Sequence, residues 1–246
     1  MIKSAQIFAL FICSVMIISG CATVYDLRET ERASIPRSSF VEIKAVIKKS
    51  VCKNGVCKYK VMSGLSSGVV IKKNNLGSYV LGAEHACAVK KISRISGNHV
   101  KFMIVGASGK EYASDIIMID KQNDICVFFV KGMKHVSVVK MRDTPPKYGE
   151  RVYNLASPLG TAYPPTTIPV FVGHYSGFIK GLDVYTIPAK GGSSGSPILD
   201  TRGQLLGMLV GHHRGFNQIS VSPRFSSIKR IVNKIKSYKI SHGDES

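Results

Sequence analysis

The amino-acid sequence predicts an all-β fold of antiparallel β-barrels followed by one C-terminal α-helix. Short apolar runs typical of strands recur from residue 41 to residue 221, separated by turn signals such as Asn74-Asn75. No helical pattern interrupts these runs, which argues against strands alternating with helices around a parallel sheet. Apolar residues make up 44% of the chain, enough to bury a substantial core. An apolar spacing of three and four residues appears only after the last run and indicates an amphipathic helix.

Two groups of strands are predicted, one for each barrel. The first, in an N-terminal barrel at about 41–143, comprises Val41–Ile47, Val56–Met62, Ser67–Ile71, Tyr79–Leu81, His99–Ile104, Ile116–Met118 and Ile125–Val130. The second follows a connector at 144–147 and forms a C-terminal barrel at about 148–223, with Arg151–Leu155, Thr167–Val172, Tyr175–Ile179, Val184–Ile187, Pro197–Leu199, Leu205–Val210 and Gln218–Val221. Successive strands without crossover helices are expected to pair as antiparallel neighbours.

The C-terminal helix is predicted at about 226–239, within a folded domain that spans about 41–240. Ser226 or Ser227 is the expected N-cap, because a serine hydroxyl can accept a free N–H of the first turn. The apolar stripe comprises Phe225, Ile228, Ile231, Val232 and Ile235, and the opposite face carries Lys229, Arg230, Lys234 and Lys236. We expect this helix to pack on the second barrel, with attachment to a membrane surface as the alternative.

The first 20 residues are expected to be a lipoprotein signal peptide. Lys3 precedes an apolar stretch at 5–18, which is shorter than the roughly 20 residues of a membrane span. The end of this stretch, Ile18-Ser19-Gly20-Cys21, resembles a bacterial lipobox. The resemblance implies cleavage before Cys21 and acylation of that residue, with residues 21–40 as a polar tether. The protein is then exported and lipid-anchored in the cell envelope, at the outer membrane or the periplasmic face. An uncleaved anchor or an ordinary signal peptide is the alternative.

Cys52 and Cys57 flank a predicted hairpin turn. Asn54-Gly55 is the preferred pair for a two-residue turn of type I′, which sets Cys52 opposite Cys57 in a pair without mutual hydrogen bonds. Side chains approach most closely in such pairs. The sequence therefore predicts a disulfide in an exported protein, with two free thiols as the alternative. No paired ligands occur at zinc spacing, so no metal site is expected.

Three segments carry residue types suited to nucleophilic catalysis. Gly192-Ser193-Ser194-Gly195-Ser196-Pro197 combines a serine with glycines, which permit the tight turn that aims backbone N–H groups at a developing oxyanion. His85 follows an apolar run and offers an imidazole base. Asp124 enters another apolar run and offers a carboxylate that can orient the imidazole. Each signal alone is more often a turn, a structural histidine or a strand-entry aspartate.

Together these segments resemble the trypsin-like serine proteases, closest to the HtrA/Deg group. The order His, Asp, Ser is that of the chymotrypsin class, whereas subtilisins and α/β-hydrolases use other orders. Residues 192–197 resemble Gly-x-Ser-Gly-Gly-Pro, residues 82–87 resemble Thr-Ala-Ala-His-Cys, and residues 120–128 resemble Asp-x-x-x-Asp-Ile-Ala-Leu-Leu. Residues 66–71 resemble Gly-Ser-Gly-Phe. Residues 148–152 resemble Gly-Glu-x-Val, and residues 157–160 resemble Asn-Pro-Leu-Gly. The likeness covers about residues 63–235, and no PDZ domain is expected after it. Gly82, Glu84 and Ser196 depart from the family pattern.

The resemblance implies two six-stranded barrels and an acyl-enzyme mechanism with His85, Asp124 and Ser194 as the triad. Asp120, and then Asp115, are the fallback carboxylates. The oxyanion hole is expected from the N–H groups of Gly192 and Ser194. No cofactor is implied, and the partners are polypeptide substrates. Because Cys87 and Cys126 each follow a triad residue by two positions, a second disulfide between them is expected.

The specificity pocket is expected to be lined by residues before the nucleophile and by the strand after it. These are Ala189, Lys190, Gly191, Leu209, Val210, Gly211 and His212. No carboxylate stands at the pocket base, which argues against a preference for lysine or arginine and favours a small or medium apolar residue. His212 and His213 leave a preference for acidic or polar residues as the alternative. The backbone of Leu209–Gly211 is expected to pair with extended substrate.

Two other functions stay open, and the formal net charge of +19 motivates the first of them. A basic surface attracts anionic polymers, although no zinc-finger or other specific nucleic-acid motif is present, so no specific nucleic-acid partner is expected. Gly82 and Glu84 motivate the other alternative, a catalytically weak protease-like module that binds or chaperones proteins at the cell envelope.

Overall fold

The computed structural model describes residues 34–53, 56–88, 99–162 and 167–238, without the side chains of 49–60 and 99. The chain divides after Ser34, and both β-structures lie in the compact unit Ile35–Ser246. A short 3-10 turn, η1 (Arg37–Ser39), leads into the first strand. The predicted signal peptide and Cys21 lie outside the described residues. In the part that is described, no helix is long and apolar enough to cross a membrane.

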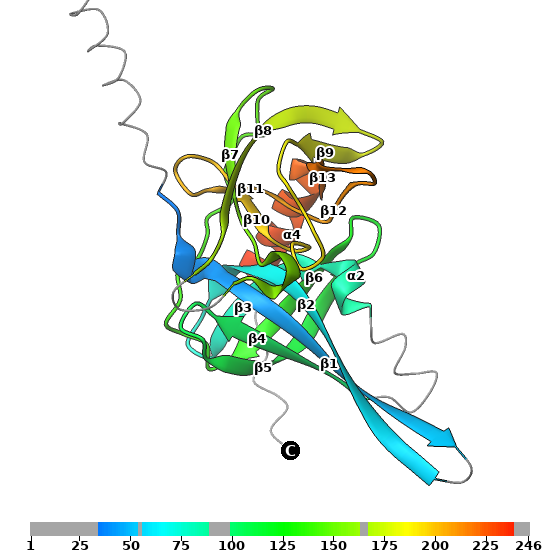
Figure 1. The fold of residues 1–246 in the computed structure, drawn as a ribbon. Helices are drawn as coiled ribbons and strands as arrows, with labels where there is room; N and C mark the ends of the chain where they lie inside the picture. Colours follow the sequence, from blue (N-terminus) through cyan, green and yellow to red (C-terminus); the bar gives the residue numbers. More distant parts are fainter. Residues whose placement is uncertain (1–33, 54–55, 89–98, 163–166, 239–246) are drawn as a thin grey trace, which may run out of the picture. The chain divides into compact units, whose positions relative to one another are not determined.

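The N-terminal half forms a closed antiparallel barrel with strand order β1-β2-β3-β6-β5-β4 (Figure 1). The strands are β1 (Phe40–Lys53), β2 (Val56–Lys73), β3 (Gly77–Ala83), β4 (His99–Gly106), β5 (Glu111–Asp120) and β6 (Ile125–Lys131), with the short helix α2 (Glu84–Cys87) after β3. Ile43, Phe102, Ile104 and Phe128 belong to the buried cluster that fills this barrel. The predicted six-stranded N-terminal barrel is confirmed.

Strands β1 and β2 continue beyond the barrel as a long two-stranded arm (Figure 1). The two strands predicted at Val56–Met62 and Ser67–Ile71 are one strand, because Ser63–Ser66 stay paired with Ile43–Val46 of β1. The pairing sets Cys52 opposite Cys57, as expected from the Asn-Gly turn. Their side chains lie outside the described residues, so that disulfide stays a prediction.

The C-terminal half forms a seven-stranded sheet with order β11-β10-β7-β8-β9-β13-β12. The strands are β7 (Arg151–Leu155), β8 (Val170–Ile179), β9 (Leu182–Tyr185), β10 (Pro197–Leu199), β11 (Leu205–Met208), β12 (Gly211–His213) and β13 (Phe216–Pro223), with a 3-10 turn η2 (Pro158–Gly160) after β7. The strand predicted to break before Tyr175 is continuous. Gly173 makes this possible, since a Cβ there would lie 2.4 Å from the carbonyl oxygen of Thr186.

The two ends of this sheet, β11 and β12, are consecutive in the chain. Only Leu209 and Val210 separate them, so the sheet curls back on itself. β11 and β12 are therefore the two parts of one interrupted strand, and the seven strands correspond to six. The predicted strand Leu205–Val210 therefore ends at Met208. The interruption arises because Leu209 bonds to the loop before β10: its N–H donates to Ser196 O (2.9 Å) and its carbonyl accepts from Gly195 N–H (2.7 Å). The predicted double barrel is confirmed, with this break in its second half.

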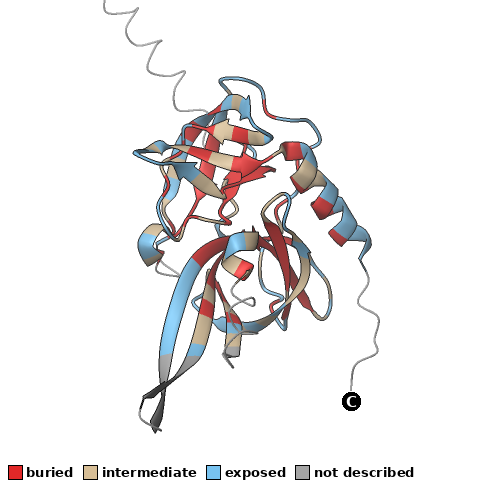
Figure 2. Cartoon of the chain, turned by 90° about the vertical axis from the view of Figure 1, so that its right-hand side faces the viewer, coloured by how far each residue is buried: buried red, intermediate tan, exposed pale blue. Residues whose placement is uncertain are grey.

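Helix α4 (Phe225–Ser237) follows β13 and lays its apolar stripe against the body of the protein (Figure 2). The predicted caps are wrong: Ser226 and Ser227 lie inside the first turn, and the N-cap residue Arg224 makes no side-chain cap hydrogen bond. The buried carboxylate of Asp183 on β9 replaces them, accepting from Phe225 N–H at 2.7 Å. Tertiary structure thus supplies the cap that the local sequence lacks.

The other end of α4 is held by the first barrel. The Nζ of Lys72 on β2 donates to the carbonyl oxygens of Ile235 (2.9 Å), Lys236 (3.1 Å) and Tyr238 (2.6 Å). Asp183 and Lys72 place a negative charge at the helix N-terminus and a positive charge at the C-terminus, both favourable to the helix dipole. The helix therefore ties the second barrel to the first.

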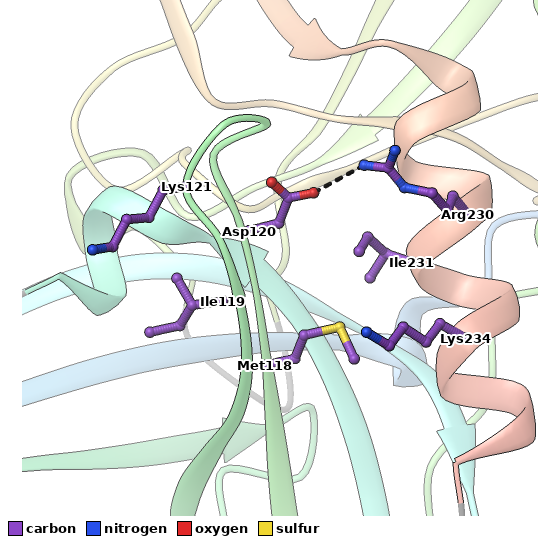
Figure 3. A pocket seen from close by; sticks show the side chains of 7 residues that line it. All are labelled: Met118, Ile119, Asp120, Lys121, Arg230, Ile231 and Lys234. Atoms are coloured by element: carbon purple, nitrogen blue, oxygen red, sulfur yellow. Dashed lines mark hydrogen bonds and ion pairs between the residues drawn. The ribbon is translucent and has the colours of Figure 1, made fainter.

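The middle of α4 lines a surface cavity of about 590 Å³ together with the end of β5 and the first residue after it (Figure 3). Its lining residues are Met118, Ile119, Asp120, Lys121, Arg230, Ile231 and Lys234. Arg230 donates to Asp120 across the cavity at 3.1 Å, which gives the helix a second tie to the first barrel, besides Lys72.

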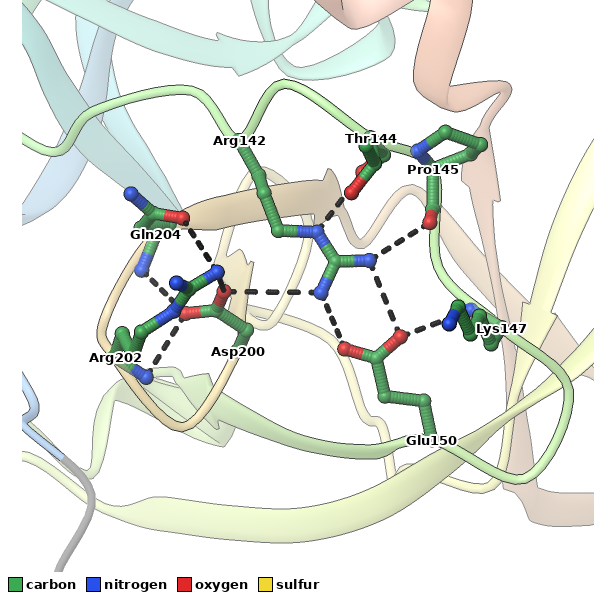
Figure 4. Close-up of polar contacts among 8 residues, drawn as sticks. All are labelled: Arg142, Thr144, Pro145, Lys147, Glu150, Asp200, Arg202 and Gln204. Carbon is green, nitrogen blue, oxygen red and sulfur yellow. Dashed lines mark hydrogen bonds and ion pairs between the residues drawn. The ribbon is translucent and has the colours of Figure 1, made fainter.

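The connector between the barrels is fixed by the buried guanidinium of Arg142 (Figure 4). It donates to the carbonyl oxygens of Thr144 (2.9 Å) and Pro145 (2.8 Å) and to both carboxylate oxygens of Glu150. Burial alone would raise the pKa of Glu150, but the hydrogen bonds and charges of Arg142 and Lys147 together lower it below its usual range. The predicted connector at 144–147 is thus an ordered turn.

Candidate active site

His85 and Asp124 are brought together by the pairing of β3 with β6. Ala83 and Ile125 are the last pair of that register, and the two candidate residues lie just beyond it, His85 in α2 and Asp124 in the turn before β6. Ser194 belongs to the second half of the chain, in the loop before β10. The three side chains are 39 and 70 positions apart in sequence, as 124 − 85 and 194 − 124 give.

The three side chains form a hydrogen-bonded line. Nδ1 of His85 lies 2.8 Å from Oδ2 and 3.1 Å from Oδ1 of Asp124, and Nε2 lies 2.9 Å from Oγ of Ser194. The His85 backbone N–H also donates to Asp124 Oδ1 at 2.8 Å. The fallback carboxylates lie elsewhere: Asp120 bonds to Asn123 and Arg230, and Asp115 is exposed on β5.

The environment of His85 favours its protonated form. Its hydrogen bond to Asp124 raises the pKa, partial burial opposes this, and the charges of Asp124 and Glu84 raise it further. The result is a pKa above the usual value of a histidine. The carboxylate also favours the tautomer with a proton on Nδ1, which leaves Nε2 free to accept from Ser194.

Cys87 and Cys126 form a disulfide directly behind the pair. Both cysteines are fully buried, one at the end of α2 and the other on β6. The disulfide expected from the family resemblance is therefore present. It fixes the segment that carries His85 to the segment that carries Asp124.

The loop around Ser194 depends on two glycines in the left-handed region. Gly192 has φ of +95° and Gly195 has φ of +87°. A Cβ at Gly192 would lie 2.4 Å from Ser157 O, and one at Gly195 would lie 2.0 Å from Ser67 O. Both positions require glycine, for conformation and for space. The loop thus passes unusually close to backbone from both barrels.

The backbone N–H groups of Gly192 and Ser194 are aimed by the carbonyls of their own peptide groups. Gly191 O accepts from Leu159 N–H at 2.7 Å, and Ser193 O accepts from Ser196 N–H at 3.1 Å. Since C=O and N–H point in opposite directions in a trans peptide, each anchored carbonyl sets the direction of the N–H beyond it. Among the described residues neither N–H has a hydrogen-bond acceptor.

The expected pocket residues divide into buried and accessible ones. Ala189 and Leu209 are buried, and both backbone groups of Leu209 are bonded to the nucleophile loop. The Val210 N–H also has a partner, Val221 O at 2.9 Å, and the expected pairing of substrate with Leu209–Gly211 stays a prediction. Lys190, Gly191 and His212 are exposed, and Val210 and Gly211 are half-buried.

The three departures from the family pattern have local explanations. A Cβ at Gly82 would lie 2.9 Å from Cδ1 of Ile43, so a threonine there would require the end of the Ile43 side chain to shift. Glu84 N–H donates to Asp124 O at 3.1 Å, a bond that any side chain at 84 allows. The Ser196 hydroxyl bonds to Asn154 Nδ2 at 2.7 Å, so this buried polar group is paired.

Ser67, Ser157 and Glu42 are buried residues beside the loop to which the sequence analysis assigned no role. Ser67 Oγ donates to Gly192 O at 2.9 Å, and Ser67 N–H donates to Ser194 O at 2.8 Å. A charged residue between the apolar Val41 and Ile43 was the available signal for Glu42. In the described part of the chain no group of three His, Cys, Asp or Glu side chains could hold a metal ion.

Comparisons with known proteins agree with this architecture. A family model described as trypsin-like peptidase domain matches residues 66–208. No curated protein sequence is significantly similar to the chain. The crystal structure of the serine endoprotease from Yersinia pestis is similar in fold, with a TM-score of 0.60 and 16% sequence identity over 83% of this chain. The match spans 64% of that solved chain. With more than half of its residues matched by the family model, the chain belongs to the trypsin-like peptidase domain family.

Proposed function

We propose that the protein is a serine endopeptidase that acts through an acyl-enzyme intermediate. Ser194 is the nucleophile. His85 takes the hydroxyl proton at Nε2 and returns it to the leaving amine, while Asp124 orients the ring and stabilises its cation. The observation that carries this proposal is the contact of both ring nitrogens of His85, one with Asp124 and the other with Ser194.

The N–H groups of Gly192 and Ser194 are proposed to stabilise the tetrahedral oxyanion. Support comes from the anchoring of Gly191 O and Ser193 O, which leaves both N–H groups without a partner in the described residues. Donors that are already oriented cost no reorganisation when negative charge develops on the substrate oxygen.

We propose polypeptides with a small or medium apolar residue before the scissile bond as substrates. Ala189 and Leu209 are buried and uncharged, and none of the seven residues expected to line the pocket is Asp or Glu. His212 and His213 are exposed on β12, so a preference for acidic residues is the outcome that would overturn this choice. Sequencing of the fragments from a digested peptide library distinguishes the two.

Labelling with a fluorophosphonate tests the catalytic assignment. Ser194→Ala is expected to abolish labelling and to lower kcat by at least about 10⁴-fold, as for other triad serines, without loss of the fold. Ser193→Ala is the matched control, because it removes a neighbouring buried hydroxyl and should still label. Labelling that survives Ser194→Ala would refute the assignment. A folded wild-type protein that never labels would favour the binding or chaperone module instead.

We also propose that the chain is exported and attached to the cell envelope through an acylated Cys21, at the outer membrane or the periplasmic face. The support is the apolar segment ending in two small residues and cysteine. When the protein is produced in bacteria fed a labelled fatty acid, the wild type is expected to carry the label and fractionate with membranes. Cys21→Ser should carry none. Equal labelling of both would exclude this anchor.

A further inference from the structure

Three buried polar side chains beside the nucleophile loop take no part in the proposed proton transfers. Glu42 lies on β1, Ser67 directly opposite it on β2, and Ser157 in the segment after β7. Their exposed fractions are 6%, 0% and 0%. Buried polar groups are costly unless hydrogen-bonded, so their partners indicate what they do.

The hydrogen bonds of these side chains run in one direction. Ala162 N–H donates to Ser157 Oγ (3.0 Å), whose own proton goes to Glu42 Oε2 (2.8 Å). Ser157 N–H donates to Ser67 Oγ (3.0 Å), whose proton goes to Gly192 O (2.9 Å). Each hydroxyl has a single proton, and an ionised carboxylate only accepts. The arrangement is therefore fixed, with every hydroxyl both donating and accepting.

The chain of bonds ends on the loop that carries the proposed oxyanion donors. Ser67 Oγ holds Gly192 O, and Leu159 N–H holds Gly191 O, so both carbonyls around the Gly192 N–H are anchored. Leu159 has φ of +55°, a strained conformation for a non-glycine residue. Fixing Ser157 at the start of the same turn supports that conformation.

We propose that Ser67, Ser157 and Glu42 are positioning residues that hold the Gly191–Ser194 loop in the geometry needed to bind an oxyanion. This inference rests on the proposed function. Gly191 and Gly192 lack side chains that would restrict their peptide groups, so the loop depends on external bonds. Without the Ser67 hydroxyl, Gly192 O and Ser157 N–H both lose their partner, and the Gly192 N–H is then held only through the bond of Gly191 O to Leu159 N–H.

The test compares variants that remove or retain individual bonds. Ser67→Ala removes the last donor. Glu42→Leu removes the acceptor that orients Ser157, whereas Glu42→Gln keeps an acceptor oxygen at similar volume. Ser78→Ala is the matched control, because Ser78 is equally buried and its hydroxyl donates to the backbone of Met133 within the first barrel, away from the loop.

Two rates are measured for each variant, alongside its thermal unfolding. One is the rate at which a fluorophosphonate modifies Ser194. The other is kcat, with KM, for a quenched peptide that spans a bond the wild type cuts in casein. Ser67→Ala is expected to lower both rates by about 10- to 100-fold, less than or comparable to loss of an oxyanion donor itself, with little change in KM. Glu42→Leu is expected to lower both rates by a similar factor, and Glu42→Gln is expected to retain more activity.

The outcomes separate this inference from the proposed function. Should the wild type and Ser78→Ala label while Ser67→Ala and Glu42→Leu react at the wild-type rate, the positioning role is refuted and the function stands. Equal rate losses in Ser67→Ala and Ser78→Ala would also refute it, since they would reflect stability alone. If Ser67→Ala does not fold, the pair at Glu42 decides. A wild type that never labels refutes the proposed function itself.

Discussion

Asp124 holds a backbone conformation that side chains rarely adopt, with φ of +52°. For a non-glycine residue this costs about 1–2 kcal/mol, least for Asp and Asn. The turn is kept by two N–H groups of α2, from Glu84 to the Asp124 carbonyl and from His85 to its carboxylate. The strain therefore serves to face the carboxylate toward the imidazole.

Glu84 gives a prediction for the pH dependence of cleavage. His85 acts as a base only when neutral, so kcat/KM is lost as pH falls through its raised pKa. Glu84→Gln removes one negative charge that raises this pKa. The acidic limb of the kcat/KM profile is expected to move to lower pH, with the plateau at higher pH unchanged. A limb that stays in place or moves to higher pH would contradict the assigned role of Glu84.

Single residues also show what the sequence could predict about the site. His85, Asp124 and Ser194 follow from local motifs, because each occupies a recognisable turn or strand boundary. Ser67, Ser157 and Glu42 do not, since their contacts form only when β1, β2 and the segment after β7 meet. No local pattern encodes a hydrogen bond between residues 90 or 115 positions apart.

At the scale of elements, the sequence predicted most strands but misplaced several boundaries. Short strand-like runs bounded by turn signals located β7 and β10 at their observed bounds. The continuous β2 and β8 were each divided at small residues, because pairing with a neighbouring strand overrides weak local propensity there. The cap of α4 was missed for a similar reason: Asp183 stands 42 residues before Phe225, beyond the reach of any local signal.

Arg142, just before the connector between the barrels, can be compared with Arg202, which contacts the same aspartate. Arg142 and Arg202 both approach Asp200, at 3.7 and 3.6 Å, but their side chains are 9% and 73% exposed. Arg142→Ala leaves the carboxylate of Glu150 with only the Lys147 N–H as a partner and is expected to lower the free energy of unfolding by about 3–5 kcal/mol. Arg202→Ala should lower it by at most about 1 kcal/mol. Urea titrations measure both, and equal losses would contradict a structural role for Arg142.

At the scale of the whole molecule, the candidate site lies between two barrels whose relative position must be maintained. His85 and Asp124 belong to one barrel and Ser194 to the other, and α4 is bonded to both, through Asp183 at one end and Lys72 at the other. Family resemblance was enough to predict the double barrel. The role of the helix as a tie was not predictable, because it depends on the partners of its two ends.

Lys72 gives a test of this tie. Lys72→Met removes three donated hydrogen bonds and the positive charge at the helix C-terminus, and is expected to lower the free energy of unfolding by about 1–2 kcal/mol. Lys73→Met is the control, since the neighbouring Lys73 donates once, to Val136 O within the first barrel. Thermal unfolding of both variants decides, and an equal loss in the two would mean that Lys72 does not tie the barrels.

The position of α4 in the chain also orders events during biosynthesis. Residues 225–238 are translated only after both barrels, so the bonds of α4 to the first barrel cannot form before then. Until then Ser194 lies in one barrel and His85 in the other, and α4 does not yet join the two barrels. A half-made chain therefore lacks the hydrogen bonds that Lys72 donates to the C-terminal end of α4.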